Sequence, residues 1–181
     1  MVTRLNAIQN DEATGKAKEL LDAVQGKLGM TPNLMKTFAN SPAALEGYLN
    51  LNEALSSTLS ATLREQISIA VANENSCRYC LSAHTAIGKM TGLSEAEVAA
   101  ARLGDSGDAK AKAALTFAKR VLAERGSVTD EDVNAVREAG FGDREITEIV
   151  ANVGLNVLTN YFNNVARTEI DFPEVALTAA A

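Results

Sequence analysis

Helix start and stop signals recur along almost the whole chain, and they constrain its fold more than any other feature. Stretches with apolar residues at helical spacing alternate with short polar breaks, and several stretches begin at a capping residue. The expected helices cover residues 14–28, 34–38, 41–56, 61–73, 77–90, 94–103, 108–124, 129–140 and 144–167. Apolar residues make up 46% of the chain, many of them alanines that allow helices to pack closely. We therefore expect an all-α fold.

Chain length and charge limit the class of protein. A chain of 181 residues suits one compact domain. The net charge of -6 leaves no basic face of the size that nucleic acid or an anionic membrane would need. The first residues lack the apolar segment of a secretion signal, and no stretch approaches the roughly 20 apolar residues of a membrane span. We therefore expect a cytoplasmic protein with no nucleic-acid partner and no membrane partner.

The two cysteines of the chain, Cys77 and Cys80, are separated by only two residues. A disulfide closing so small a loop would restrain the unfolded chain very little, so the pair indicates redox chemistry or metal binding. Residues 73–76 favour a turn, which predicts that a new helix begins at Cys77. Residues three apart on a helix lie within the roughly 4.4–6.8 Å that disulfides span between Cα atoms, so the pair can be oxidised with little backbone movement.

His84 is the single histidine, and helical geometry places it on the same stripe as both cysteines, one turn beyond Cys80. Unpaired N–H groups and the positive end of the dipole at a helix start favour a thiolate, most of all at the nearest sulfur. An imidazole is suited to accept the thiol proton near neutral pH. Glu65, on the preceding apolar helix, is placed to orient that imidazole or to relay its proton. The residues predict a thiol redox site.

The stretch from Glu65 to His84, EQISIAVANENSCRYCLSAH, resembles the signature of the alkylhydroperoxidase D-like (AhpD-like) family within the carboxymuconolactone decarboxylase superfamily. The glutamate, both cysteines and the histidine agree in spacing. Residues 160–163 and 171–173 are also similar to a peroxidase-related branch of that family. The resemblance implies one AhpD-like helical domain over residues 1–181, with a core of about 41–173, that assembles into homo-oligomeric trimers or hexamers.

The resemblance also implies an activity, the reduction of hydrogen peroxide or small organic hydroperoxides. Cys80 would be the sulfur that attacks the peroxide, and Cys77 the one that resolves the product into a disulfide. Glu65 and His84 match the family positions that pass protons. The resemblance implies no bound cofactor and no metal; electrons come from an external dithiol reductant, in some members a lipoylated protein.

Tyr79 marks a departure from the family pattern, because the best-known members carry a second histidine between the cysteines. A phenol stays protonated at neutral pH, so a two-histidine proton relay is excluded here. Tyr79 can instead hydrogen-bond to a peroxide or a water, or it can pack as an aromatic at a subunit contact.

Each candidate residue has a simpler interpretation as well. The cysteines can be two small buried side chains, or they can join His84 and Glu65 around a zinc ion. Glu65 also matches a capping box with Thr62, in which it would bond to a backbone N–H instead of relaying protons. His84 can be an ordinary core residue. Two other functions compete with a peroxidase: decarboxylation of a muconolactone-type acid, which has no evident need for a cysteine pair, and redox sensing by a non-catalytic helical oligomer.

One short pattern occurs twice in the chain. Residues 67–73 and 146–152 share the sequence Ile-Ser/Thr-x-x-Val-Ala-Asn, in two apolar helices. An internal helical duplication, shared packing needs or chance would each explain so short a match. The Ala-rich end, residues 178–181, is expected to fray or to pack loosely against a neighbour.

Overall fold

The computed structural model describes residues 2–177, and within that range the chain is all-helical, as predicted. The helices are α1 (Gly15–Leu28), α2 (Asn33–Phe38), α3 (Pro42–Leu55), α4 (Ala61–Glu74), α5 (Arg78–Met90), α6 (Glu95–Arg102), α7 (Ala109–Ala123), α8 (Asp130–Glu138) and α9 (Asp143–Ala166). In this part of the chain no helix combines the length and the hydropathy needed to cross a membrane. The expectation for residues 178–181 lies outside the described residues.

Local capping decides where most helices begin. The side chains of Ser41, Ser94, Asp108 and Thr129 each accept a hydrogen bond from a backbone N–H of the following first turn. Each of the four was expected from the sequence. The start of α9 differs from the prediction, because Asp143 is its first residue and not its cap. Gly142 is the N-cap, and its N–H donates to Oε2 of Glu145 at 2.9 Å.

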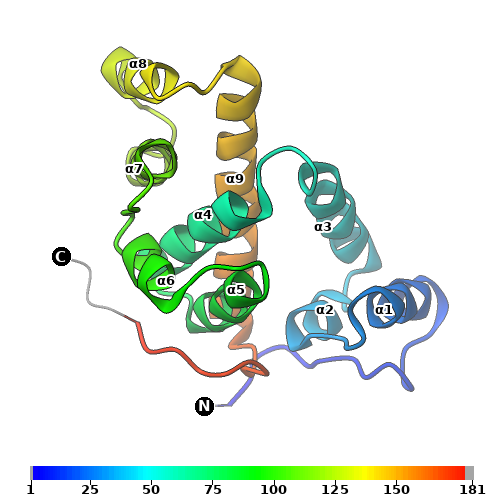
Figure 1. Ribbon diagram of the computed structural model, residues 1–181. Coiled ribbons are helices and arrows are strands. Elements are labelled where there is room, and N and C mark those ends of the chain that lie inside the picture. The colour runs from blue at the N-terminus through cyan, green and yellow to red at the C-terminus, as the bar shows by residue number, and fades with distance from the viewer. Residues whose placement is uncertain (1, 178–181) are drawn as a thin grey trace.

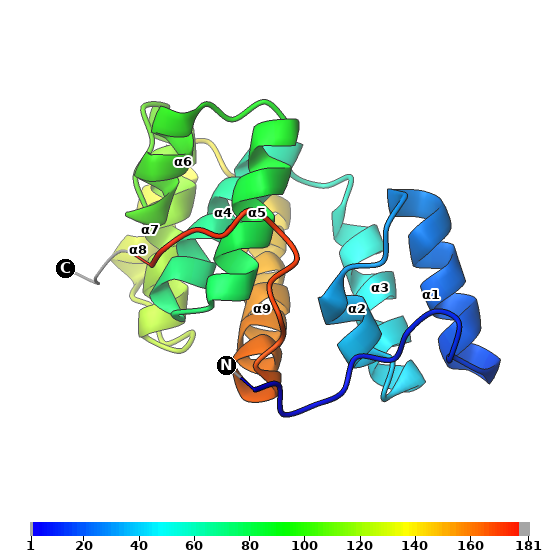
Figure 2. The ribbon, with the colours of Figure 1, turned by 90° about the horizontal axis from the view of Figure 1, so that it is seen from below.

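Two groups of helices make up the fold (Figures 1 and 2). In the larger group α4 packs against α5, α6, α7 and α9, and its residues 66–73 are all buried, as the apolar sequence predicted. The smaller group, α1 to α3, lies to one side and meets the larger one at α9. At this junction the ring of Phe38 stacks on that of Phe162, with centroids 3.9 Å apart. This stacking contact links the end of α2 to α9.

The two chain ends close over the larger group. The segment after α9 runs across α5 and α6 (Figure 2), and the N–H of Val175 donates to Oγ of Ser82 on α5 at 3.0 Å. At the other end, the N–H of Arg4 donates to the carbonyl of Ala166 at 2.8 Å. The first contact places the segment after α9 against α5, the helix that starts at the cysteine pair.

The longest helix, α9, buries several polar residues beside apolar ones, and it also exposes apolar residues. Its buried face carries four asparagines, namely Asn152, Asn156, Asn160 and Asn163. Its exposed face carries Val150, Leu158, Tyr161 and Val165. At 100° per residue, this exposed set falls within a sector of about 80°. A globular helix normally buries apolar residues and exposes polar ones, so the buried asparagines and the exposed apolar residues of α9 both need an explanation.

The two copies of the repeated pattern lie on α4 and α9, which pack against each other. In both copies the hydroxyl at the second position bonds to a carbonyl four residues earlier. Ser68 donates to the carbonyl of Arg64 at 2.8 Å, and Thr147 donates to that of Asp143 at 2.7 Å. The shared pattern therefore includes a shared local hydrogen bond.

Candidate active site

The turn between α4 and α5 sets the position of the cysteine pair. Ser76 adopts a left-handed conformation with φ of 53°, which ends α4 and reverses the chain. Asn75, beside it, donates from Nδ2 to Oδ1 of the wholly buried Asn160 at 3.0 Å. The carbonyl of Asn75 in turn accepts from Nδ2 of Asn164 at 3.0 Å. Helix α9 therefore holds the turn that delivers Cys77.

The cysteine pair lies at the start of α5, and this helix begins one residue later than predicted. Cys77 is the N-cap instead of the first helical residue, and its Sγ accepts the N–H of Cys80 at 3.3 Å. Both residues are free thiols and almost wholly buried. The two sulfurs are 2.6 Å apart, with the Cys77 thiol donating to Sγ of Cys80. A disulfide between them requires little movement of the backbone.

Several groups converge on the Cys80 sulfur and favour its thiolate. Burial alone would oppose ionisation. The hydrogen bond from Cys77, the charge of His84 and hydrogen bonds from Asn163 and Asn160 outweigh burial and lower the pKa of Cys80 to about 7. The bond from Asn163 joins Nδ2 to Sγ at 3.2 Å. A substantial fraction of Cys80 is therefore ionised at neutral pH.

Cys77 shows the opposite behaviour, which corrects one expectation from the sequence. The sulfur nearest the helix start was expected to gain most from the helix dipole. Donation of its proton to Cys80 is the largest effect, and together with burial it raises the pKa of Cys77. Backbone N–H groups at the helix start lower that pKa, but by less. Proton sharing between the two sulfurs thus dominates over the dipole.

His84 and Glu65 form a hydrogen-bonded pair between α5 and α4. His84 Nδ1 lies 2.8 Å from Oε2 of Glu65, and the two side chains are 23% and 12% exposed. Burial opposes protonation of the imidazole, but the Glu65 carboxylate and the neighbouring Cys80 raise the pKa of His84. Because this bond fixes Nδ1, the other ring nitrogen is left to exchange protons with the site.

The capping-box interpretation of Glu65 is wrong. Helix α4 begins one residue before Thr62, and its cap is Ser60, whose Oγ accepts the N–H of Leu63 at 3.2 Å. Thr62 therefore lies inside the first turn and is not the N-cap, so Thr62 and Glu65 do not form a capping box. The carboxylate of Glu65 is directed to His84 instead.

Tyr79 packs within its own chain and is 4% exposed. Its hydroxyl oxygen accepts the N–H of Leu34 at 3.0 Å, and its ring meets Phe172 edge-on with centroids 5.9 Å apart. Burial, as the largest effect, raises the pKa of Tyr79, so its phenol stays protonated. The structure thus places Tyr79 as a contact between the cysteine turn, α2 and the chain end.

Three residues near the cysteines were not expected as site residues. Asn160 and Asn163 were noted only within residues 160–163, which resemble a peroxidase-related branch of the family. Their spacing of three residues, which places both on one face of a helix, was the sequence signal that could have indicated a shared role. Tyr48, on α3, was not singled out at all. Burial, as the largest effect, and the charges of Cys80 and Glu65 raise the pKa of Tyr48, so its phenol interacts electrostatically with both groups. Only the packing of α3 and α9 brings these residues to the site.

A cavity of about 790 Å³ adjoins the site at the start of α5 and the end of α9. Its walls include Arg78, Tyr79, Asn163, Arg167 and Thr168. Asn163 therefore contacts this cavity and the sulfur of Cys80 at once.

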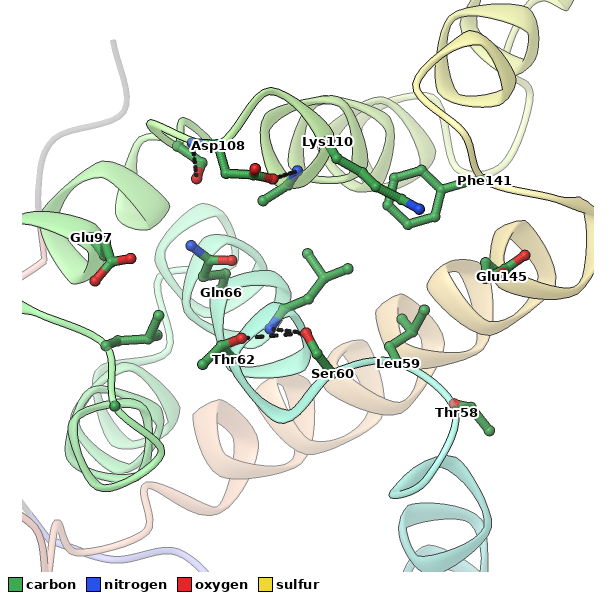
Figure 3. Close-up of a pocket in the computed structure, with 15 residues that line it drawn as sticks. Thr58, Leu59, Ser60, Thr62, Gln66, Glu97, Asp108, Lys110, Phe141 and Glu145 are labelled. Carbon is green, nitrogen blue, oxygen red and sulfur yellow. Dashed lines mark hydrogen bonds between the residues drawn. The ribbon is translucent and has the colours of Figure 1, made fainter.

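A second cavity, of about 410 Å³, lies at the first turn of α4 (Figure 3). Gln66 lines it, together with Asp108, Lys110 and Phe141, and the Lys110 ammonium lies 4.6 Å from the centre of the Phe141 ring. Its lining includes none of the residues Glu65, Cys77, Cys80 and His84. Successive residues of α4, Glu65 and Gln66, thus face different sites.

The arrangement of the four candidate residues is not that of a metal centre. Among residues 2–177, no group of three or more His, Cys, Asp or Glu side chains is placed to hold a metal ion. The geometry instead pairs the residues two by two, sulfur with sulfur and imidazole with carboxylate.

Known proteins resemble this chain in sequence and in fold. Residues 42–124, which include the four candidate residues, match the carboxymuconolactone decarboxylase family. A peroxidase-related protein with an alkylhydroperoxidase AhpD core, from Ralstonia eutropha JMP134, has a TM-score of 0.84 and 25% identity over 94% of this chain and 93% of that one. An uncharacterized peroxidase-related protein from Silicibacter sp. TM1040 has a TM-score of 0.81 and 26% identity, over 96% and 92%.

A third similar structure, the debrominase Bmp8, is 19% identical with a TM-score of 0.78, over 94% and 93% of the two chains. At that identity the likeness shows the shared fold alone. No curated protein matches the sequence. The family match spans the cysteine site, and the similar structures share almost the whole fold. Residues 42–124 therefore match the carboxymuconolactone decarboxylase family, whose members are enzymes, and almost the whole chain shares the AhpD-like fold of these peroxidase-related proteins.

Proposed function

We propose that this protein is a thiol-dependent peroxidase that reduces hydrogen peroxide or small organic hydroperoxides. The observation that carries the proposal is the unequal ionisation of two sulfurs in contact. The pKa of Cys80 is lowered to about 7, while that of Cys77 is raised. A low-pKa thiol attacks a peroxide as its thiolate, and a neighbouring protonated thiol can then resolve the product.

The proposed cycle has two steps at the cysteines. The Cys80 thiolate attacks the terminal oxygen of the hydroperoxide, so that an S–O bond forms, the O–O bond breaks and a sulfenic acid results. Cys77 then attacks the Cys80 sulfur, which forms a disulfide and releases water. The starting distance of 2.6 Å between the two sulfurs makes the second step a local one.

His84 and Glu65 manage the protons of the first step. His84 accepts the proton of Cys80 as the thiolate forms, and it returns a proton to the alkoxide or hydroxide that leaves the peroxide. Glu65 holds the ring through Nδ1 and stabilises the imidazolium that forms in between. Glu65 thus acts on the sulfur through His84.

The remaining parts of the proposal concern partners. An external dithiol, for which a lipoylated protein is one candidate, reduces the Cys77–Cys80 disulfide and restores the thiols. We also propose a homo-oligomer in the cytoplasm, formed through the apolar face of α9 that carries Leu158, Tyr161 and Val165, each 47–59% exposed. An exposed apolar stripe of this length favours a protein partner over water.

Other activities exist on this fold, as the debrominase Bmp8 shows. A carboxymuconolactone-type decarboxylase has no evident need for paired thiols, and a redox sensor needs the disulfide but no turnover. Alkylation of the thiols separates the first alternative, because a decarboxylase would keep its activity. Peroxide stoichiometry separates the second, since a sensor consumes about one equivalent per chain and then stops.

Two cysteine variants test the proposed cycle. We expect Cys80→Ser to lower peroxide consumption with a dithiol by roughly a thousandfold, because it removes the attacking sulfur. Cys77→Ser should still form one sulfenic acid per chain in a single turnover, which a dimedone adduct reports by mass spectrometry. Equal residual activity in the two variants would contradict the assigned order of the sulfurs. Each variant is the matched control for the other, since both replace a buried thiol of the same pair.

A further inference from the structure

The side-chain amide of Asn163 separates the reactive sulfur from the larger cavity. Asn163 is 3% exposed, and its Nδ2 donates to Sγ of Cys80 at 3.2 Å. The same residue forms part of the wall of the cavity of about 790 Å³, next to Tyr79 and Thr168. The amide is therefore placed to contact the sulfur and a molecule in that cavity together.

The other polar atom of this amide has no protein partner. Oδ1 of Asn163 is buried and accepts no hydrogen bond from any residue that the structure describes. The equivalent oxygen of Asn160, one turn earlier, accepts from Asn75 at 3.0 Å. A buried carbonyl oxygen without a donor is costly in free energy and is uncommon in native proteins. Oγ1 of Thr168, in the same cavity wall, is also buried and without a partner.

A ligand with a hydrogen-bond donor next to the sulfur would satisfy Oδ1 of Asn163. In a hydroperoxide, the oxygen that a thiolate attacks is the one that bears the proton. That O–H is the donor that Oδ1 lacks, and it belongs to the atom that must approach Sγ. Because Nδ2 and Oδ1 belong to one rigid amide, a donor bound at Oδ1 is held close to the sulfur.

We propose that Asn163 is a further catalytic residue, whose Oδ1 accepts the terminal O–H of the hydroperoxide while its Nδ2 stabilises the Cys80 thiolate. This inference rests on the proposed peroxidase function. During attack the S–O bond forms and the O–O bond breaks, so the sulfur is oxidised by two electrons and the peroxide is reduced. The attacked oxygen keeps its proton and its bond to Asn163, and it becomes the sulfenic acid. The leaving oxygen takes its proton from His84.

The test compares two electrophiles on the reduced full-length protein. Hydrogen peroxide offers an O–H at the reacting atom, whereas iodoacetamide reacts with the same thiolate without one. In Asn163→Ala we expect the pKa of Cys80, read from the pH dependence of alkylation, to rise by about one unit, because the thiolate loses a hydrogen bond. At pH values above that pKa, alkylation should recover to the wild-type rate. At the same pH values the reaction of Asn163→Ala with hydrogen peroxide should remain about tenfold slower than that of the wild type.

Two outcomes would overturn the inference. If the alkylation rate and the peroxide rate of Asn163→Ala both recover at high pH, Asn163 acts only on the pKa of Cys80. If both rates stay lowered by the same factor, the role of Asn163 is structural. Asn163→Leu repeats the test in a side chain of similar size, and thermal melts show which variants are folded. Asn156→Ala is the matched control, since it removes another buried amide of α9, one that bonds to Ser68 at 3.1 Å instead of a sulfur. It should change neither rate.

The proposed function can fail separately from this inference. A wild-type thiolate that alkylates normally but does not react with hydrogen peroxide would refute the peroxidase, and the role of Asn163 with it. A wild-type protein that reacts with peroxide, together with an unchanged ratio of the two rates in Asn163→Ala, would refute only the role of Asn163.

Discussion

Cys80 and Cys77 have the same chemistry, and their surroundings alone make them different. The N–H of Cys80 donates a hydrogen bond to the sulfur of Cys77, and the thiol of Cys77 donates one to the sulfur of Cys80. The imidazolium of His84 then adds a positive charge near Cys80. Because the pKa of Cys80 in the folded protein is lower than the ordinary value of 9.0, ionisation of this thiol stabilises the folded state. The stabilisation is fully present above pH 9.0. This contribution is lost as the pH falls through about 7.

Glu65→Gln tests the link from the carboxylate to the sulfur. Without the negative charge the pKa of His84 should fall, so the imidazolium no longer supports the thiolate and the pKa of Cys80 should rise by about one unit. The pH dependence of Cys80 alkylation, followed by mass spectrometry, measures this shift. Glu74→Gln is the control, because Glu74 lies on the same helix but pairs with Lys119 at the surface, 3.4 Å away. Similar profiles for the two variants would exclude a role of Glu65 at the sulfur.

At the scale of elements, α2 depends on residues far from it in the sequence. It has six residues, follows Pro32 and has no capping side chain of its own. Its first two N–H groups instead bond to distant side chains, that of Asn33 to Oδ2 of Asp171 at 2.7 Å and that of Leu34 to the hydroxyl of Tyr79 at 3.0 Å. The cysteine turn and the chain end therefore serve as the cap of this short helix.

Tyr79→Phe should destabilise the protein by about 1–2 kcal/mol, because it leaves the N–H of Leu34 buried without an acceptor. The free energy of unfolding from urea denaturation measures the effect. Ser57→Ala is the control, since it removes an exposed hydroxyl outside the apolar face of α9, and a change of at most about 0.5 kcal/mol is expected there. If the two variants lose equal stability, the capping role of Tyr79 is wrong.

At the scale of the whole molecule, the buried asparagines and the exposed apolar face of α9 have separate explanations. Its buried asparagines hold the turn before Cys77 and bond to the Cys80 sulfur, through Asn160 and Asn163 respectively. Its exposed face has no partner among residues 2–177, since Leu158, Tyr161 and Val165 remain about half exposed. A second copy of the chain is the partner that we propose for this face.

Replacing Leu158 and Val165 together with glutamate should lower the mass of the assembly toward that of one 19.1 kDa chain, because two charges would be buried in the contact. Light scattering coupled to size-exclusion chromatography measures the mass. Met90→Glu is the control, since Met90 is 79% exposed on α5 and away from α9 in the sequence, and it should leave the assembly intact. A wild-type protein that is monomeric at micromolar concentration would refute the proposed oligomer.

The sequence by itself determined the features that depend on near neighbours. Ser41, Ser94, Asp108 and Thr129 each cap a helix through a backbone N–H three residues away, and the spacing of Cys77 and Cys80 brings the two sulfurs together at the helix start. For these features the relevant contacts lie within one helical turn, which a local pattern can specify.

Only the tertiary structure decided which sulfur ionises and which face of α9 is buried. The amide that contacts Cys80 comes from Asn163, 83 residues later in the chain, and the phenol of Tyr48 comes from a helix in the other group. A periodic pattern in the sequence does not indicate interactions between residues so far apart in the chain, because the free energies of burial and hydrogen bonding depend on which helices pack together. The buried asparagines of α9 become favourable only once α4 and α5 supply their partners.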